Sequence, residues 1–159
     1  MLKVRIIAVG GMKERDLEES CAEYQKRLSA FCSPEITELK EARLPDAPSA
    51  KEIAAALSEE GERILAAIPP RSFTVVATPE GRSLSSEELA ARIEAESLTH
   101  PSLCFIIGSS HGLSPEVKRR ADLLISFSAM TFPHRLFRLM LLEQIYRSFT
   151  IIKGTGYHK

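Results

Sequence analysis

The end of this chain carries its densest set of reactive groups. Tyr157, His158 and Lys159 follow two glycines, and a chain end has no packing requirement for an imidazole and a phenol. An imidazole exchanges protons near neutral pH, whereas a phenol can donate a hydrogen bond or stack on a ring. Two interpretations of this tail remain open: it is frayed and silent, or it docks on a partner and supplies these groups to a site.

A second candidate is the segment Gly108–Gly112, GSSHG, which matches the Gly-x-Ser-x-Gly pattern of a hydrolase nucleophile elbow. Ser110 would be the nucleophile, and Asp122 and then His134 or His158 follow in the chain order of such hydrolases. An elbow serine feeds directly into a helix, however, and here a glycine and a proline delay the next helix. The alternative is that the two glycines let the backbone bend and approach a ligand closely.

Histidines and cysteines are few and scattered, with no spacing typical of metal ligation. We therefore expect no metal site. Of the histidines, the one before Pro101 is expected in a loop, and the one after Pro133 could be structural or functional. The residues concerned are His100, His111, His134, Cys21, Cys32 and Cys104.

The sequence lacks the signals of a membrane or exported protein. Every window of about 20 residues contains charge, so no transmembrane helix is expected. The first residues, MLKVR, lack the apolar segment and cleavage site of a signal peptide. An odd number of cysteines without ligand spacing favours free thiols in a reducing compartment. We expect a cytoplasmic protein that does not enter a membrane.

The net charge and its distribution along the chain limit the ligands that the protein is expected to bind. The chain of 159 residues carries no formal net charge at pH 7, which speaks against a general nucleic-acid binder. Residues 118–159 nevertheless hold eight Lys or Arg against two acids, whereas residues 1–70 hold ten against thirteen. A basic C-terminal third indicates either a local patch for a polyanion or a set of solvated faces, and both interpretations stay open.

The elements that must position these groups alternate between strand and helix. Such alternation predicts an α/β fold: one domain over residues 1–159, with a five- to six-stranded, mostly parallel sheet and helices on both faces. Two capping boxes, Ser49 with Glu52 and Ser85 with Glu88, mark helix starts. Strands are expected at 3–9, 35–39, 73–78, 103–107 and 123–127, and helices at 16–31, 50–68, 86–97, from 115 and at 136–152, with a turn at 79–82.

In a parallel sheet, ligands bind at the carboxyl ends of the strands. Three loops are expected there, at 77–81, 108–112 and 127–132, and none contains the Lys of a phosphate-binding P-loop. Their small and apolar residues suit a flat adenine ring better. Phe127, Met130 and Phe132 would line such a pocket, and main-chain groups would read the polar edge of the ring.

The long helix at 136–152 is apolar on nearly every side. A helix that is apolar all round is buried all round, and one small domain rarely surrounds a helix. Two interpretations remain: an ordinary C-terminal core helix, or a helix that packs on the sheet and on a partner subunit. Glu143 and Arg147 are four residues apart and are expected to pair.

Several blocks, in order along the whole chain, resemble the small bacterial SPOUT methyltransferases of the RlmH (YbeA-like) type. The resemblance is most specific in its last blocks, where the order and the chain length both agree. The matching residues are the opening strand with Gly10, EYQKRL at 23–28, FIIG at 105–108, Gly112-Leu113, SFS at 126–128, MTFPH at 130–134, LEQIYR at 142–147 and YHK at 157–159.

The resemblance implies features that no pattern argument gives. True knots are nearly absent from proteins, yet this family has a deep trefoil knot at its C-terminus. It further implies an obligate homodimer, S-adenosylmethionine as methyl donor, and N3-methylation of a pseudouridine in 23S rRNA within the assembled ribosome. A neutral protein with a basic third is suited to docking on a large structured RNA.

Carried over residue by residue, the resemblance places the donor contacts in the three loops. Ala77, Ser109 and Ala129 depart from the residues that the family usually has, but contacts made through the backbone tolerate such changes. The implied cofactor-binding residues are Ala77, Gly108, Phe127, Ser128, Ala129, Met130, Thr131 and Phe132.

For the chemistry, His158 is the candidate base for the imide proton and Tyr157 would position or stack on the target base. Arg138 or Arg147 could hold a phosphate or a developing oxyanion. Two alternatives remain: a ribosome-binding dimer without catalytic activity, and a serine hydrolase built on Ser110.

Overall fold

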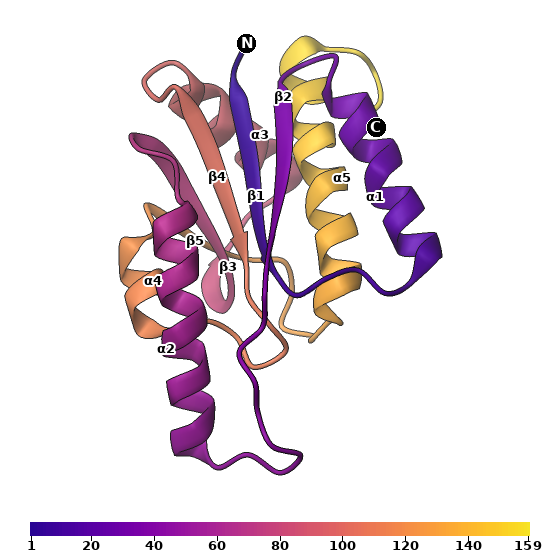
Figure 1. Ribbon diagram of the computed structural model, residues 1–159. Helices are drawn as coiled ribbons and strands as arrows, with labels where there is room; N and C mark the ends of the chain where they lie inside the picture. The colour runs from indigo at the N-terminus through magenta and orange to yellow at the C-terminus, as the bar shows by residue number, and fades with distance from the viewer.

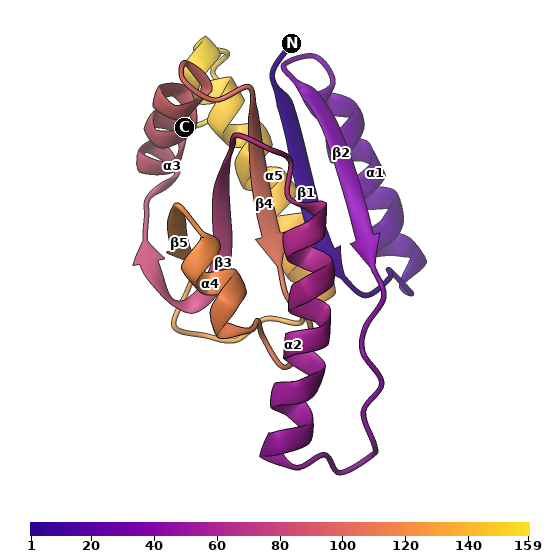
Figure 2. The ribbon, with the colours of Figure 1, turned by 60° about the vertical axis from the view of Figure 1, so that its left-hand side comes forward.

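The computed structural model describes all residues 1–159, and strands and helices alternate along it (Figures 1 and 2). The five strands form one sheet in the order β2-β1-β4-β3-β5, and every pair is parallel. The expected α/β class is confirmed. The elements are β1 (Lys3–Val9), α1 (Arg15–Leu28), β2 (Ser33–Leu39), α2 (Ala50–Ala67), β3 (Ser72–Ser83), α3 (Ser86–Ser97), β4 (Ser102–Ile107), α4 (Pro115–Arg120), β5 (Leu123–Ser126) and α5 (His134–Lys153).

Helices cover both faces of the sheet because the central strands are apolar on both sides. Along β1, Val4 and Ile6 join one core cluster while Ile7 and Val9 join the other, the period-2 alternation of a strand. The first cluster packs α1, α3 and α5 on one face, and the second packs α2 and α4 on the opposite face (Figure 1).

Local sequence signals fix most helix starts. Both expected capping boxes form. The hydroxyl of Ser49 accepts from the backbone N–H of Glu52, and that of Ser85 accepts from the backbone N–H of Glu88. The carboxylate of each glutamate accepts in turn from the backbone N–H of its cap serine. Ser114 caps α4 with Pro115 at the first position, as expected.

Three expected boundaries were wrong. The first helix ends at Leu28 rather than at residue 31, and β2 begins early enough to include Pro34, which an edge strand tolerates. The turn expected at 79–82 does not end β3 either, because Ala77 and Arg82 both pair with Ile125 across a bulged excursion.

Gly81 allows β3 to pair with β5 again after the bulge. A Cβ at this position would lie 2.5 Å from the carbonyl carbon of Ile125, so only a bare backbone can approach β5 so closely. The sequence showed a proline and a glycine and indicated a turn. The close contact with another strand is a tertiary feature that the local pattern does not contain.

The long helix α5 begins at His134, directly after Pro133, and is flanked by α1 and α3. Seven of its residues are buried, and every other residue up to Ile152 is half-buried. The expectation of burial all round is therefore met only in part within one chain. None of the helices is long and apolar enough to cross a membrane.

The cysteines are free and buried. Burial raises the pKa of the Cys32 and Cys104 thiols to about 12. Both thiols therefore stay protonated at neutral pH, and they serve as small apolar core groups rather than as nucleophiles.

Candidate active site

Three loops leave the carboxyl edge of the sheet beside one another, because β3 pairs with both β4 and β5. The first is the bulged excursion within β3 between Ala77 and Arg82, the second begins at Gly108 and the third at Phe127. The sequence therefore placed these loops correctly relative to the sheet, and Figure 2 shows them along the lower edge.

The loop at Gly108 is folded tightly on itself. The N–H of Gly112 donates to the carbonyl of Ser109 at 2.9 Å, and a Cβ on Gly108 would lie 2.4 Å from the carbonyl oxygen of Gly112. Gly112 has φ +93°, a left-handed conformation that favours glycine. The glycines thus serve backbone bending and close approach of the loop to itself, while close approach to a ligand stays a prediction.

The hydrolase triad is not assembled. The carboxylate of Asp122 accepts from the backbone N–H of Thr74 at 2.7 Å, which ties it to β3. His134 lies against Glu41, and His158 binds Glu87. No hydrogen bond links Ser110 to a base, and α4 begins only at residue 115. The geometry argues against a nucleophile elbow.

The third loop, residues 127–132, is held mainly by local bonds. The hydroxyl of Ser126 donates to the carbonyl of Ser128 at 3.1 Å, and the N–H of Met130 donates to the hydroxyl of Ser128 at 3.0 Å. The Phe127 ring packs on Phe137 with centroids 4.6 Å apart. Met130 is 77% exposed, so the expected apolar pocket is open on this side.

Two observations test whether these loops suit a methyl donor with an adenosyl group. Gly112 and Leu113 occupy the place that a Cβ on Gly108 would take, so the loop turns sharply at the end of β4 and presents main-chain groups there, which can read the polar edges of a ring. The hydroxyl oxygen of Thr78, next to Ala77, is buried without a hydrogen bond of good geometry, which is uncommon in folded proteins, and it lies near the Glu80 carboxyl, whose pKa it helps to lower. The residues present fit such a group.

A cavity of about 550 Å³ adjoins the third loop between α3 and α5. Of the implied donor contacts, only Phe127 lines it, so the cavity is a neighbour of the donor loops rather than the donor site itself. At its other end it reaches Glu143 and Gln144. Its lining residues are Tyr24, Leu84, Ser85, Ser86, Leu89, Ile125, Ser126, Phe127, Leu139, Met140, Glu143 and Gln144.

The tail turns back along α5 because of two left-handed glycines, Gly154 at φ +64° and Gly156 at φ +75°. The N–H of Thr155 donates to the carbonyl of Thr150, and that of Gly154 to Ile151, the bond pair of a Schellman motif. The tail is therefore docked on its own chain.

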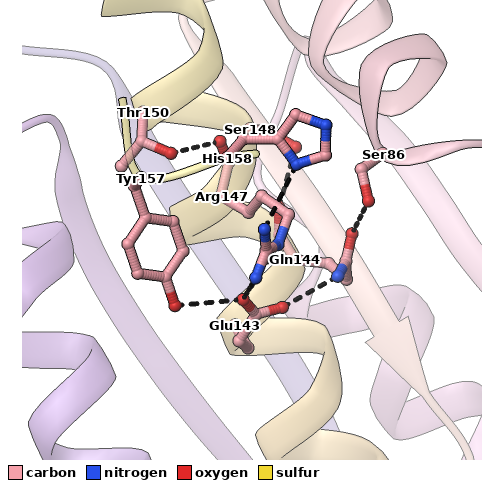
Figure 3. A network of polar contacts seen from close by, with 8 residues as sticks. All are labelled: Ser86, Glu143, Gln144, Arg147, Ser148, Thr150, Tyr157 and His158. Carbon is pink, nitrogen blue, oxygen red and sulfur yellow. Dashed lines mark hydrogen bonds and ion pairs between the residues drawn. The ribbon is translucent and has the colours of Figure 1, made fainter. Parts of the chain in front are cut away.

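Side chains of the tail and of α5 form one polar network (Figure 3). Arg147 donates to Oε1 of Glu143 through Nε at 3.0 Å and Nη2 at 2.7 Å, and Tyr157 donates to the same oxygen at 3.2 Å. The expected Glu143–Arg147 pair is confirmed. His158 lies between Arg147, 3.2 Å from Nδ1, and Glu87, 2.7 Å from Nε2.

The hydrogen-bond partners of His158 determine which ring nitrogen carries the proton. Arginine can only donate, so Nδ1 accepts from Arg147 and Nε2–H donates to Glu87 in the neutral ring. This bond from His158 holds the pKa of the Glu87 carboxyl below its usual range. The basic nitrogen of His158 is thus occupied while the tail is docked in this way.

Tyr157 remains a hydrogen-bond donor. The hydroxyl of Tyr24, burial and the Glu143 carboxylate raise the pKa of Tyr157 to about 12, so the phenol is neutral at pH 7. Its ring lies 5.0 Å from that of Tyr146, which in turn lies 5.9 Å from that of Tyr24. All three tyrosines of the chain therefore form one cluster at the tail.

Arg138 lies away from this network. It is 5% exposed and donates to Glu38 at 2.9 Å and to the carbonyl of Gly10 at 2.9 Å. Nine residues of helix, about 13 Å, separate it from Arg147. The two arginines considered for one role therefore occupy different parts of α5.

Most of the basic C-terminal third is paired with acids. Lys153 and Lys159 make no ion pair, but the other six cations do. This weakens the interpretation as an open patch for a polyanion. The pairs are Lys118–Glu80, Arg119–Glu116, Arg120–Asp122, Arg135–Glu14, Arg138–Glu38 and Arg147–Glu143.

Two residues of the site escaped sequence reasoning. Glu87 belongs to a capping segment, so its sequence context indicated only a helix start. Thr78 sits in an apolar strand, and nothing local marks its hydroxyl as unpaired. No group of three or more His, Cys, Asp or Glu side chains is placed to hold a metal ion.

The fold has a counterpart among solved structures. A solved structure described as a probable methylase family protein from Haemophilus influenzae Rd KW20 superposes with a TM-score of 0.56 over 98% of this chain and 70% of that one. At 13% identity, this likeness shows the fold alone.

The sequence comparisons go further. A family model described as "Predicted SPOUT methyltransferase" matches residues 2–158. The relatives include proteins named "Ribosomal RNA large subunit methyltransferase H" from Carboxydothermus hydrogenoformans, 49% identical, and Streptococcus gordonii, 48% identical. Each alignment covers 99% of this chain and 100% of the relative. The chain belongs to the SPOUT methyltransferase family.

Proposed function

We propose that this protein transfers a methyl group from S-adenosylmethionine to N3 of a pseudouridine in 23S rRNA within the assembled ribosome. The observation that carries the proposal is the cavity between α3 and α5, which is lined both by Phe127 of the third loop and by Glu143 of the tail network. The names of full-length relatives at 48–49% identity support the RNA substrate.

The donor contacts are assigned to Ala77, Gly108 and residues 127–132, as the family resemblance implies. When bound, S-adenosylmethionine supplies an activated methyl group, so the protein's main task is to align N3 with it. Backbone groups at Gly108 and the unpaired hydroxyl of Thr78 are available to orient the donor.

The imide proton of the target base must leave as N3 reacts, and His158 is the base proposed for it. In the docked tail Nδ1 accepts from Arg147, about 20 Å along α5 from the donor loop 127–132, so His158 must leave this partner and the tail must move to the donor loop before His158 accepts the proton. Tyr157, neutral with a pKa of about 12, then donates a hydrogen bond or stacks on the target base. Arg147, once released from His158, remains available to a developing oxyanion.

Two further parts of the proposal concern assembly. A homodimer would cover the half-buried face of α5 that includes Leu136, Leu139 and Met140, and the open side of the 550 Å³ cavity. A trefoil knot around the donor loops is proposed from the family resemblance. Both agree with a helix that one small chain does not fully bury.

The test combines binding and transfer. Calorimetry with S-adenosylmethionine should show saturable heat, and ribosomes from a strain lacking the gene should gain one methylated pseudouridine on incubation with protein and donor, seen by mass spectrometry of 23S rRNA. A ribosome-binding dimer without catalytic activity would give no heat. A hydrolase would instead be labelled at Ser110 by a fluorophosphonate probe.

A further inference from the structure

The start of α5 has no local cap. Its N-cap residue is Pro133, which makes no side-chain cap bond, and its first turn contains no acid. Helix starts leave backbone N–H groups that are usually satisfied nearby. The position of this start must therefore be determined by contacts with other parts of the chain.

Those contacts reach the opposite end of the sequence. Arg138 donates through Nη2 to the carbonyl of Gly10 and through Nη1 to Glu38, both at 2.9 Å. One turn earlier, Arg135 donates through Nε to the carbonyl of Gly11 at 3.0 Å and through Nη1 to Glu14 at 3.2 Å. We name these four bonds the β1 clasp, because they hold the start of α5 to the segment that leaves β1.

The clasp depends on a close approach at its other end. Gly10 has φ +92°, and a Cβ there would lie 2.6 Å from Oε1 of Glu41. The side chain of Arg138 is only 6% exposed, and its bond to the Gly10 carbonyl is shielded from water, whereas the Glu38 carboxylate is partly exposed. The planar guanidinium can satisfy a carbonyl and a carboxylate together, which a lysine ammonium on a flexible stem does less well.

We propose that Arg138, assisted by Arg135, is a positioning residue that fixes the donor-binding loop 127–132 through the β1 clasp. This inference rests on the proposed function, because it takes residues 127–132 as the donor loop. The loop's own bonds are local, and Ala129 and Met130 are exposed. Its path is therefore set by its two ends, β5 on one side and the start of α5 on the other.

A loop held in its binding conformation loses less entropy when a ligand binds, so the clasp should contribute to donor affinity. It should contribute little to the chemical step once donor is bound, because Arg138 lies about 13 Å along α5 from Arg147 and touches neither the tail nor the cavity. This separation distinguishes a positioning role from a catalytic one.

The chain offers a matched control. Arg5 also bridges a carboxylate and a carbonyl, Glu35 at 2.7 Å and Ala67 at 3.2 Å, but it lies on β1 away from the donor loops. Arg138→Lys and Arg5→Lys therefore remove the same fork geometry while they keep the charge. Donor affinity by calorimetry, KM and kcat for the donor with ribosomes, and hydrogen–deuterium exchange are measured for both.

Arg138→Lys should raise the Kd and KM for S-adenosylmethionine about tenfold and leave kcat at saturating donor within about twofold. Amide exchange should accelerate at residues 10–14 and 127–133 only, and Arg5→Lys should leave all three readouts near wild type. An unchanged donor Kd in Arg138→Lys, an equal loss in Arg5→Lys, or faster exchange throughout the chain would overturn the inference. If wild type bound no donor, the proposed function would fail, and exchange at 127–133 would still decide the clasp.

Discussion

The two ends of α5 are held by different kinds of contact. At the first, Arg138 and Arg135 reach the backbone carbonyls of Gly10 and Gly11, more than 100 residues away in the chain, and Arg138 is buried. At the second, the tail is held by side-chain pairs around Glu143, and the side chains of Arg147 and His158 are 25% and 27% exposed.

This difference separates two tasks along one helix. The bond from Arg138 to the Gly10 carbonyl is buried and is costly to break without a replacement donor, which suits a loop that must hold one shape for its ligand. Half-exposed ion pairs contribute little stability and can change partners, which suits a base that must first release Arg147. The comparison predicts that variants at one end affect affinity and stability, and variants at the other affect turnover.

The largest expected effect is at the tail. His158→Ala should lower kcat for RNA methylation about 100-fold, because the imide proton loses its base. Donor affinity should stay within about twofold of wild type, since the donor loops lie at the other end of α5. Single-turnover methylation of ribosomes and calorimetry measure the two quantities. Unchanged turnover would remove His158 from the mechanism.

At the start of α5, Arg138→Met should lower the free energy of unfolding by about 2 kcal/mol, because the carbonyl of Gly10 is left buried without a donor. Arg5→Met, where the arginine side chain is 30% exposed, should cost less. Urea unfolding followed by circular dichroism gives both values. Equal losses would show that the β1 clasp is no more buried in solution than an ordinary surface pair.

The tail network can be loosened without removing its base. Glu143→Gln should lower kcat about tenfold, since Arg147 and Tyr157 lose the shared carboxylate that orients them for the oxyanion and the target base. Glu19→Gln, which breaks an exposed pair of the same spacing with Arg15, is the matched control and should leave kcat unchanged. A stability loss at Glu143 without a loss of kcat would contradict the division of tasks.

The smallest expected effect is the pH dependence of stability that His134 contributes at the start of α5. Burial, with Arg135 and Arg138 nearby, lowers the pKa of His134 below its ordinary value of 6.5. The unfolded chain therefore takes up the proton first, and His134 makes the fold lose stability as the pH falls below about 6.5, with no change above it. Wild type should lose more stability than His134→Gln between pH 7 and pH 5 in urea titrations. A constant difference between the two would contradict the shift.

Local signals in the sequence predicted much of the fold and the outline of the site. Capping boxes, apolar runs and alternation are short-range features, so the strands, the helices and the three loops were found. The pair of Glu143 with Arg147 also followed from helical spacing alone.

The remainder depends on contacts between distant residues. Arg138 was expected near a phosphate or an oxyanion, but the structure places it against Gly10, 128 positions away. Gly81 indicated a turn and instead allows β3 to approach β5. The partner of His158 on α3 was invisible for the same reason, since nothing near Glu87 in the sequence points to the chain end.

The clustering of the chain's three tyrosines has a practical consequence for solution work. The chain contains no tryptophan, so its intrinsic ultraviolet emission arises from Tyr24, Tyr146 and Tyr157 alone. Any movement of Tyr157 away from Tyr146 would alter the only fluorophores present. The tyrosine fluorescence of unlabelled protein therefore reports whether the C-terminal tail is docked on α5. Stopped-flow fluorescence could compare the rate of tail release with the rate of methyl transfer.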